Sequence, residues 1–258
     1  MKLAIIQPDS SQDVSEEIIV SIDALVSGAK RHRPDVVVFP ELFLPGYNFP
    51  DRHNNDAQTQ SGSWMNRIAG IAREYTCAIV LGWAENQDGT IYNAATAVSA
   101  KGDILAHYRK RQLFGEMEHE SFTPGRSLPP TFEIAGRKCG LLICYEIEFP
   151  EYARDLAQRG AEVVIVPTAN PVGYEHVQDI LVPARAHENR QFVAYANYCG
   201  TQNGLEFSGA SLVVGPDGKA LSRAGQIPTE LYVQLPELAT YPASALSTQL
   251  EDLRTRED

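Results

Sequence analysis

Short apolar runs alternate with longer amphipathic stretches along most of the chain. The runs are rich in β-branched residues and predict buried strands, whereas stretches with apolar residues at helical spacing predict helices. The expected strands lie at 3–7, 35–41, 77–83, 93–100, 102–107, 137–144, 161–167 and 191–198, and the expected helices at 15–31, 61–75, 149–159 and 176–190. Turn signals at 88–89 and 101–103 separate neighbouring strands, and Gly215-Pro-Asp-Gly218 predicts a later β-hairpin.

Strands that alternate with helices predict an α/β layered fold. Because no Pro- or Ser-rich linker divides the chain, we expect a single domain over residues 1–258. The polar segment 110–130 is rich in Glu, Pro and Gly and is expected to be a loop, and the charged residues 249–258 are expected to form a C-terminal tail. Segments 33–40 and 159–167 share a helix end, an acid, four apolar residues and a proline, which hints at two related halves.

Composition and charge narrow the class of protein. The chain has 258 residues, of which 43% are hydrophobic and 21% charged, as is typical of a globular protein. A net charge of −11 disfavours nucleic acid and anionic membranes as partners. No run approaches the ~20 apolar residues that span a bilayer, and the N-terminus is too soon polar for a signal peptide. We therefore expect a cytoplasmic protein.

The cysteines and histidines argue against two common kinds of site. The four cysteines contain no C-x-x-C pair, so we expect free thiols in a reducing compartment. The histidines follow no H-E-x-x-H or other close ligand spacing, so no metal site is predicted. The G-x-S-x-G pattern of many serine hydrolases does not occur.

Cys144 is the first candidate for chemistry. It ends the apolar run 141–143 and precedes a helix that is expected to begin near Pro150. A residue at such a turn is displayed beside backbone N–H groups, which suits a nucleophile next to an oxyanion hole, and a helix N-terminus lowers a thiol pKa. The alternative is a buried structural cysteine, which is what we expect of Cys77, Cys139 and Cys199.

Glu41 is the second candidate, because it directly follows the apolar run 36–40. A buried carboxylate is costly unless it has a partner or a task. Burial would raise its pKa and suit it to act as a general base near neutral pH. The alternative is a structural salt bridge. Taken alone, Lys110 is a surface cation, and the glutamates at 116, 118 and 120 form a solvated acidic loop.

Five motifs in order along residues 39–189 change this view. Each motif is weak by itself, but the ordered set is specific, and with it the chain resembles the nitrilase superfamily of carbon–nitrogen hydrolases. The motifs are Phe39-Pro-Glu-Leu-Phe-Leu-Pro-Gly-Tyr47, Tyr108-Arg-Lys110 with Leu113-Phe114, Phe122-Thr-Pro-Gly125, Gly140-Leu-Leu-Ile-Cys-Tyr-Glu146 with Phe149-Pro-Glu151, and Ala184-Arg-Ala-His-Glu-Asn189.

The resemblance implies a fold and a set of catalytic residues. The implied fold is a four-layer α-β-β-α sandwich that assembles into a homodimer or a higher homo-oligomer and needs no metal or organic cofactor. The family's Glu–Lys–Cys set falls on Glu41, Lys110 and Cys144. A second glutamate precedes the x-P-G motif in the family, and its spacing to Gly125 favours Glu118, with Glu120 as the alternative.

The resemblance also implies the reaction. An amidase of this kind cleaves a small carboxamide or N-carbamoyl amine to acid and ammonia through a cysteine thioester. Nitrilases usually carry tryptophan after the nucleophile, whereas this chain has Tyr145, as in many amidase branches, so we favour an amide substrate. Glu146 departs from the aspartate that is frequent there and leaves the branch open. The alternatives are a nitrile substrate and a catalytically idle binding or assembly protein.

Substrate contacts are expected from loops just past the strand ends, where an open α/β site gathers its walls. The expected contact residues are Tyr47, Glu120, Tyr145, Asn170 and Tyr174. In the last motif, Arg185 and Glu188 are three residues apart on one helix and are expected to pair.

Overall fold

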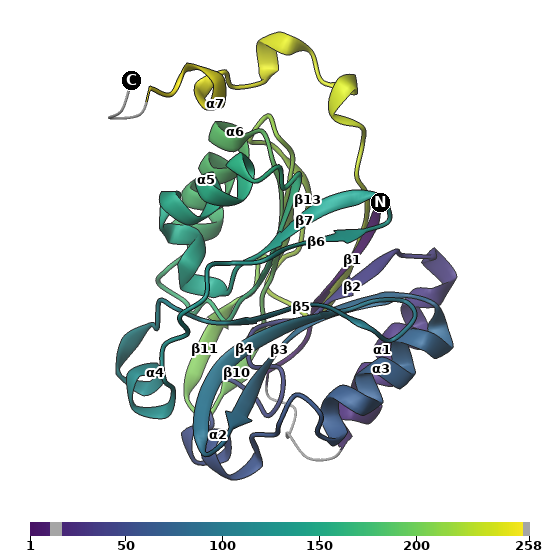
Figure 1. Ribbon diagram of the computed structural model, residues 1–258, viewed down its shortest axis with the longest axis vertical. Helices are drawn as coiled ribbons and strands as arrows, with labels where there is room; N and C mark the ends of the chain where they lie inside the picture. Colours follow the sequence, from purple (N-terminus) through teal and green to yellow (C-terminus); the bar gives the residue numbers. More distant parts are fainter. Residues whose placement is uncertain (11–16, 255–258) are drawn as a thin grey trace.

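Two six-stranded sheets form the centre of the molecule. The computed structural model describes residues 1–10 and 17–254 (Figure 1). The first sheet has the order β14(Thr229–Gln234), β1(Lys2–Gln7), β2(Val36–Val38), β3(Ala78–Gln87), β4(Thr90–Val98), β5(Ile104–Arg109). The second has the order β13(Ala220–Arg223), β12(Leu212–Val214), β9(Phe192–Ala196), β8(Val163–Pro167), β7(Arg137–Leu141), β6(Thr131–Ile134). A separate hairpin pairs β10(Cys199–Gln202) with β11(Leu205–Ser208).

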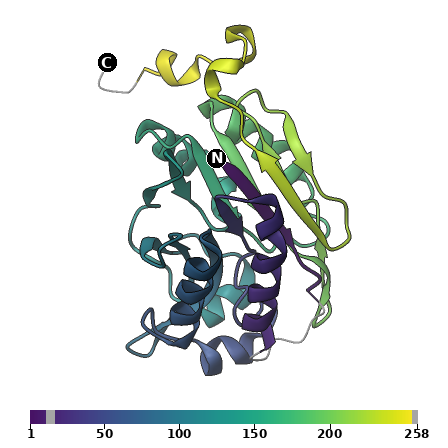
Figure 2. The same cartoon turned by 90° about the vertical axis from the view of Figure 1, so that its right-hand side faces the viewer.

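Apolar side chains on both faces of each sheet build three hydrophobic layers. Side chains alternate between the faces of a strand, so Leu3 and Ile5 enter the layer between the sheets, whereas Ala4 and Ile6 face the helices. Helices α1(Glu17–Ala29) and α3(Ser63–Tyr75) cover the first sheet, and α5(Pro150–Gln158) and α6(Val182–Asn189) cover the second (Figures 1 and 2). The predicted four-layer α-β-β-α sandwich is confirmed.

The two sheets repeat one topology. In each, three parallel strands occupy the middle, β1–β2–β3 in one sheet and β7–β8–β9 in the other. An antiparallel pair extends one side of each triplet, and a single antiparallel strand, β14 or β6, closes the other side. Strands β2 and β8, which carry the two similar sequence segments, hold equivalent central places. The similar segments 33–40 and 159–167 therefore lie at equivalent places in two halves of matching topology.

This topology brings the ends of strands from different sheets together. The chain leaves β2 at Glu41, β7 towards Cys144 and β8 at Thr168. The backbone N–H of Glu41 donates to the carbonyl of Thr168 at 3.3 Å, which joins the two sheets at this edge. A site built here draws residues from both halves of the sandwich.

The loop expected at 110–130 contains helix α4(Gly115–Ser121), so that expectation was wrong for its centre. A second short helix, α2(Pro50–Asp56), was not predicted either. Each helix is mostly polar, so neither shows the long apolar periodicity that identifies a helix in a sequence. Contacts with the rest of the fold stabilise them: the His53 ring lies 4.7 Å from the ring of Phe122, just beyond α4.

Two other boundaries differ from expectation. The strand predicted to reach Cys144 ends at Leu141, and Cys144 instead opens a 3₁₀ turn, Cys144–Glu148. The predicted tail contains helix α7(Gln249–Asp252), in which Glu251 pairs with Arg190 at the end of α6, at 2.5 Å. Residues 255–258 of that tail, and the expected start of the first helix at 15–16, lie outside the described residues.

The predicted helix 176–190 and the hairpin at 215–218 are present. The helix begins with a π turn, Val177–Leu181, before α6, and the hairpin joins β12 to β13. All four cysteines are free thiols; Cys77, Cys139 and Cys199 are buried, as expected of structural cysteines, and Cys144 is buried as well. Within residues 1–10 and 17–254, no helix is long and apolar enough to cross a membrane.

Gly82 of β3 fixes how closely that strand approaches the turn at Glu41. A Cβ at position 82 would lie 2.5 Å from the Glu41 Cα and 2.5 Å from the Leu42 N. We expect Gly82→Ala to lower the free energy of unfolding by about 1–3 kcal/mol, since both contacts are with backbone that cannot move aside cheaply. Gly70→Ala, in the open interior of α3, is the matched control and should stabilise the protein by about 1 kcal/mol. Equal denaturation midpoints for the two variants would contradict this account.

Candidate active site

A buried lysine between two glutamates forms the centre of the site. The Lys110 Nζ lies 2.5 Å from Glu41 Oε1 and 2.7 Å from Glu118 Oε1, and none of the three side chains is exposed to solvent. Glu41 follows β2, Lys110 follows β5 and Glu118 lies on α4. Three segments that are distant in sequence thus meet in one cluster of two carboxylates and one ammonium group.

Glu41 uses one oxygen for structure and leaves the other open. Oε1 accepts hydrogen bonds from Lys110 and from the Asn93 side chain, the latter at 2.8 Å. Oε2 is buried and has no hydrogen-bond partner among the described residues. The Tyr198 hydroxyl fixes the backbone by donating to the Glu41 carbonyl at 2.9 Å. The carboxyl group is therefore held in place with one oxygen free to accept a proton.

Burial makes Glu41 basic. Desolvation raises its pKa, and the negative charge of Glu118 adds to the rise, whereas Lys110 opposes it; the pKa reaches about 7. Burial acts to lower the pKa of Lys110, but Glu118 and Glu41 outweigh it and raise that pKa. The lysine therefore stays an ammonium ion across the pH range in which Glu41 titrates.

Glu118 is positioned by donors from two further segments. Its Oε1 accepts the Tyr47 hydroxyl at 2.8 Å, and its Oε2 accepts the backbone N–H of Phe114 at 3.0 Å. Tyr47 was expected to contact substrate, but its hydroxyl proton is used in the hydrogen bond to Glu118. Glu120 lies on the same helix, but its side chain is exposed. The geometry brings Glu118, and not Glu120, into the cluster.

Cys144 stands at the head of a tight turn beside this cluster. Its φ is 47°, a left-handed value that is unfavourable for a residue with a Cβ and is often found at functional sites. The side chain is only 8% exposed. Burial raises the thiol pKa well above its usual range and Glu41 raises it further, whereas Lys110, the Thr168 side chain and the Ala169 backbone act in the opposite direction. The resting thiol is therefore protonated at neutral pH. The lowered thiol pKa expected from a helix N-terminus was wrong, because burial has the larger effect.

Glu146 holds the turn Cys144–Glu148 against the segment that carries Lys110. Its buried carboxylate accepts hydrogen bonds from the backbone N–H of Ile143 at 3.0 Å, from that of Arg111 at 2.8 Å and from the Tyr108 hydroxyl at 2.7 Å. One side chain thus connects a neighbour of Cys144 to a neighbour of Lys110. The sequence marked Glu146 as part of a motif but gave no sign of this positioning task.

Arg185 supports the same turn from helix α6. It donates to the carbonyls of Ile147 at 3.1 Å and Glu148 at 2.8 Å, and its expected pair with Glu188 is present at 3.0 Å. Two buried charged residues, Glu146 and Arg185, therefore fix the turn from opposite ends.

Aromatic rings lie beyond the turn that follows Cys144. The ring of Phe114 is 5.2 Å from that of Tyr145 and 5.4 Å from that of Tyr174, and Tyr145 also contacts Phe149 at 4.9 Å. Sequence reasoning included Tyr145 and Tyr174 among the pocket residues but missed Phe114, which directly follows Leu113 in a quoted motif. The rings together form an aromatic wall beside the turn that Cys144 opens.

The side chain of Asn170 makes hydrogen bonds within the protein, although it was expected to contact substrate. Its side-chain amide donates to the Tyr174 carbonyl at 2.9 Å and to Gln178 Oε1 at 2.6 Å. Both amide hydrogens therefore hold the loop 170–174 and the π turn together. Asn93 and Tyr198, which hold Glu41, were not predicted, because an isolated polar residue in a strand pattern carries no local signal of its partner.

Comparison with known proteins agrees with this geometry. The family model described as carbon–nitrogen hydrolase matches residues 2–241. A protein of Pseudomonas protegens named hydrolase in pqqF 5′ region is 42% identical over 85% of this chain and 78% of its own length. An (R)-stereoselective amidase of Pseudomonas sp. is 38% identical over 78% of this chain and 73% of its own length.

Solved structures give the same result over nearly the whole chain. An amidase from Nesterenkonia sp. AN1, whose active-site cysteine carries added acrylamide in that structure, superimposes with a TM-score of 0.89 at 36% sequence identity and covers 98% of this chain and 96% of the amidase. The protein belongs to the carbon–nitrogen hydrolase family, within the nitrilase superfamily.

Proposed function

We propose that the protein is an amidase that hydrolyses a small non-peptide carboxamide, or an N-carbamoyl amine, through a thioester on Cys144. The observation that carries the proposal is the open Oε2 of Glu41, a buried carboxylate oxygen with a pKa near neutrality beside a protonated thiol. Related proteins named as amidases support the choice of reaction.

The first half of the reaction forms the thioester. Glu41 accepts the proton of Cys144 as the sulfur attacks the amide carbon, and the carbonyl π electrons move to oxygen. The Lys110 ammonium and the backbone N–H of Tyr145 stabilise the oxyanion. When the tetrahedral intermediate collapses, Glu41 returns the proton to the departing nitrogen, so that the C–N bond breaks and ammonia leaves.

The second half releases the acid. Water occupies the place vacated by ammonia, and Glu41 accepts its proton as the oxygen attacks the thioester carbon. The C–S bond then breaks, the carboxylic acid departs and the proton on Glu41 returns to the thiolate. Glu118 holds the Lys110 ammonium in position and, through its charge, raises the pKa of Glu41.

The surroundings of Cys144 favour an amide with an apolar substituent. The wall formed by Phe114, Tyr145 and Tyr174 offers aromatic faces rather than charge to the group next to the carbonyl. Tyr145 stands where nitrilases usually carry tryptophan, which is the residue-level reason for choosing an amide over a nitrile. A homo-oligomeric assembly and a cytoplasmic location remain predictions from the sequence.

Ammonia release from a panel of amides, N-carbamoyl compounds and nitriles tests the proposal. We expect the wild type and Cys77→Ala to release ammonia from amides or carbamoyl compounds and Cys144→Ala to release none, because Cys77 is a buried thiol behind α3 whereas Cys144 would carry the acyl group. Release of ammonia from nitriles alone would show that the protein hydrolyses nitriles and not amides. Equal release by wild type and Cys144→Ala would contradict the assignment of the nucleophile.

The two neighbouring glutamates of α4 provide a second test. Glu118→Gln should lower kcat/KM by about 100-fold, because Lys110 loses an anionic acceptor in a buried site. It should also move the acidic limb of the pH–rate profile to lower pH, since the charge of Glu118 raises the pKa of Glu41. Glu120→Gln, a matched change of an exposed side chain, should leave both quantities within about twofold. The opposite ranking would assign the role to Glu120.

A further inference from the structure

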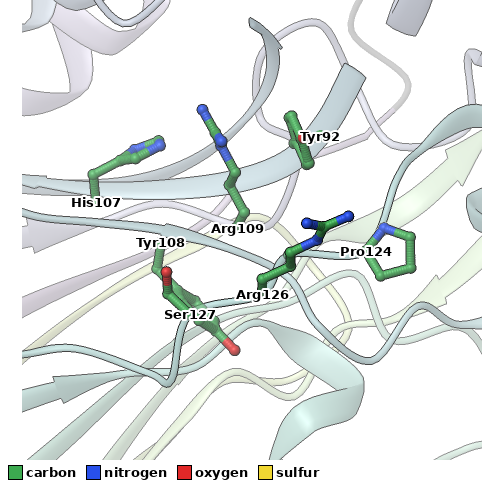
Figure 3. Close-up of a pocket in the computed structure, with 8 residues that line it drawn as sticks. Tyr92, His107, Tyr108, Arg109, Pro124, Arg126 and Ser127 are labelled. Atoms are coloured by element: carbon green, nitrogen blue, oxygen red, sulfur yellow. The ribbon is translucent and has the colours of Figure 1, made fainter. Parts of the chain in front are cut away.

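A hollow of about 470 Å³ lies at the free edge of the first sheet, apart from the catalytic cluster. Residues of β4, β5 and the segment 124–127 line it, namely Tyr92, His107, Tyr108, Arg109, Pro124, Gly125, Arg126 and Ser127. Figure 3 shows Arg109 and Arg126 arising from two different segments of the wall, with Tyr92 beside Arg109. The volume is in the range of small-molecule sites. None of its lining residues belongs to the set Glu41, Lys110, Glu118 and Cys144.

A buried hydrogen-bond chain holds His107, one of the residues that line the hollow. The Trp83 indole donates to Thr96 Oγ1 at 2.9 Å, this hydroxyl lies 2.9 Å from His107 Nδ1, and His107 Nε2 lies 3.0 Å from Glu85 Oε2. The imidazole tautomer with its proton on Nε2 satisfies every bond, because indole only donates and carboxylate only accepts. Both ring nitrogens of His107 are therefore used in hydrogen bonds to Thr96 and Glu85.

Arg109 is held by Glu85, the last residue of this hydrogen-bond chain. Its Nε donates to Glu85 Oε2 at 2.6 Å and its Nη2 to Glu85 Oε1 at 2.9 Å, and its guanidinium lies 4.2 Å from the Tyr92 ring centroid. Burial acts to raise the pKa of Glu85, but hydrogen bonds from Arg109 and His107 outweigh it and lower that pKa to about 2. Glu85 is therefore a permanent anion that balances the charge of Arg109. Nη2 of Arg109 also donates to Gln87 Oε1, so Nη1 is the only guanidinium nitrogen without a hydrogen bond within the part of the chain that the structure describes.

Arg126 supplies a charge that nothing nearby balances. Its side chain is exposed, and it forms no ion pair or hydrogen bond with any residue in 1–10 or 17–254. The chain as a whole carries a net charge of −11, so an unpaired arginine over a hollow stands out against an acidic protein. The hollow thus combines the unpaired Arg126, the oriented guanidinium of Arg109 with its unused Nη1 donor, and the Ser127 hydroxyl.

We propose that this hollow is a second ligand site, which binds a small organic carboxylate. A carboxylate has two coplanar oxygens that match the planar N–H donors of guanidinium groups, and such charge-assisted hydrogen bonds are the strong ones. The uncompensated charge of one, from Arg126, matches a monoanion. The Tyr92 ring and the Pro124 ring leave an apolar side for the body of the ligand.

Calorimetric titration with benzoate, at constant ionic strength made up with chloride, tests the site. Wild type should bind benzoate saturably at one site per chain, and Arg126→Gln should weaken this binding about tenfold or more, as expected when a charged hydrogen-bond donor is lost. Arg67→Gln is the matched control, because Arg67 is an exposed and unpaired arginine of α3 that does not line the hollow, and it should change the affinity less than twofold. Benzyl alcohol, which lacks the charge, should not bind.

Four outcomes would overturn the proposal. Equal weakening by Arg67→Gln would indicate general attraction of anions. Unchanged affinity in Arg126→Gln would place benzoate elsewhere, including the catalytic site. The absence of saturable binding at about 10 mM benzoate, tenfold above a dissociation constant of ~1 mM, would show that the hollow binds no such ligand. If inorganic phosphate binds more tightly than benzoate, the site binds a phosphate group rather than an organic carboxylate.

Discussion

The rest of the site depends on one buried ammonium group, that of Lys110, held between two carboxylates. A lysine with no solvent exposure is unstable as an ion unless it has partners, and Glu41 and Glu118 lie at 2.5 and 2.7 Å from it. Two carboxylates and one ammonium leave one negative charge too many for a buried cluster. A proton taken up by Glu41 relieves this excess, and the pKa of Glu41 is accordingly raised to about 7. The electrostatic imbalance that burial imposes is therefore the reason why the pKa of Glu41 lies near neutrality.

The two-sheet architecture explains how the cluster is assembled. The chain leaves β2 at Glu41 and β5 at Lys110 in the first sheet, and it approaches Cys144 from β7 in the second. Glu146 accepts hydrogen bonds from backbone N–H groups of both sheets' segments, and Arg185 fixes the far end of the turn Cys144–Glu148. Because both residues are buried and their polar atoms are paired, the relative position of lysine and cysteine is set by the packing of the sandwich rather than by a flexible loop.

The sequence predicted those parts of the protein that depend on local sequence patterns. Apolar runs identified the six central parallel strands, and the family motifs identified Glu41, Lys110 and Cys144, which the structure brings to one edge of the sandwich. Helices α2 and α4 were missed because tertiary contacts, such as that of His53 with Phe122, stabilise them in place of an apolar stripe. The hydrogen bonds of Asn93 and Tyr198 to Glu41, and of Glu146 to Arg111, join residues 35 to 157 positions apart, and no pattern within a segment encodes such a partner.

The pH dependence of kcat/KM, measured on the best amide of the panel at constant ionic strength, tests most directly whether a buried, near-neutral Glu41 acts as the base. Glu41 accepts the thiol proton only when it is deprotonated, so activity should be lost as the pH falls through its raised pKa. The account predicts an acidic limb with an apparent pKa of about 7. A limb near the ordinary glutamate value of about 4.3, or one above the ordinary thiol value of about 8.5, would show that this carboxylate does not control the nucleophile.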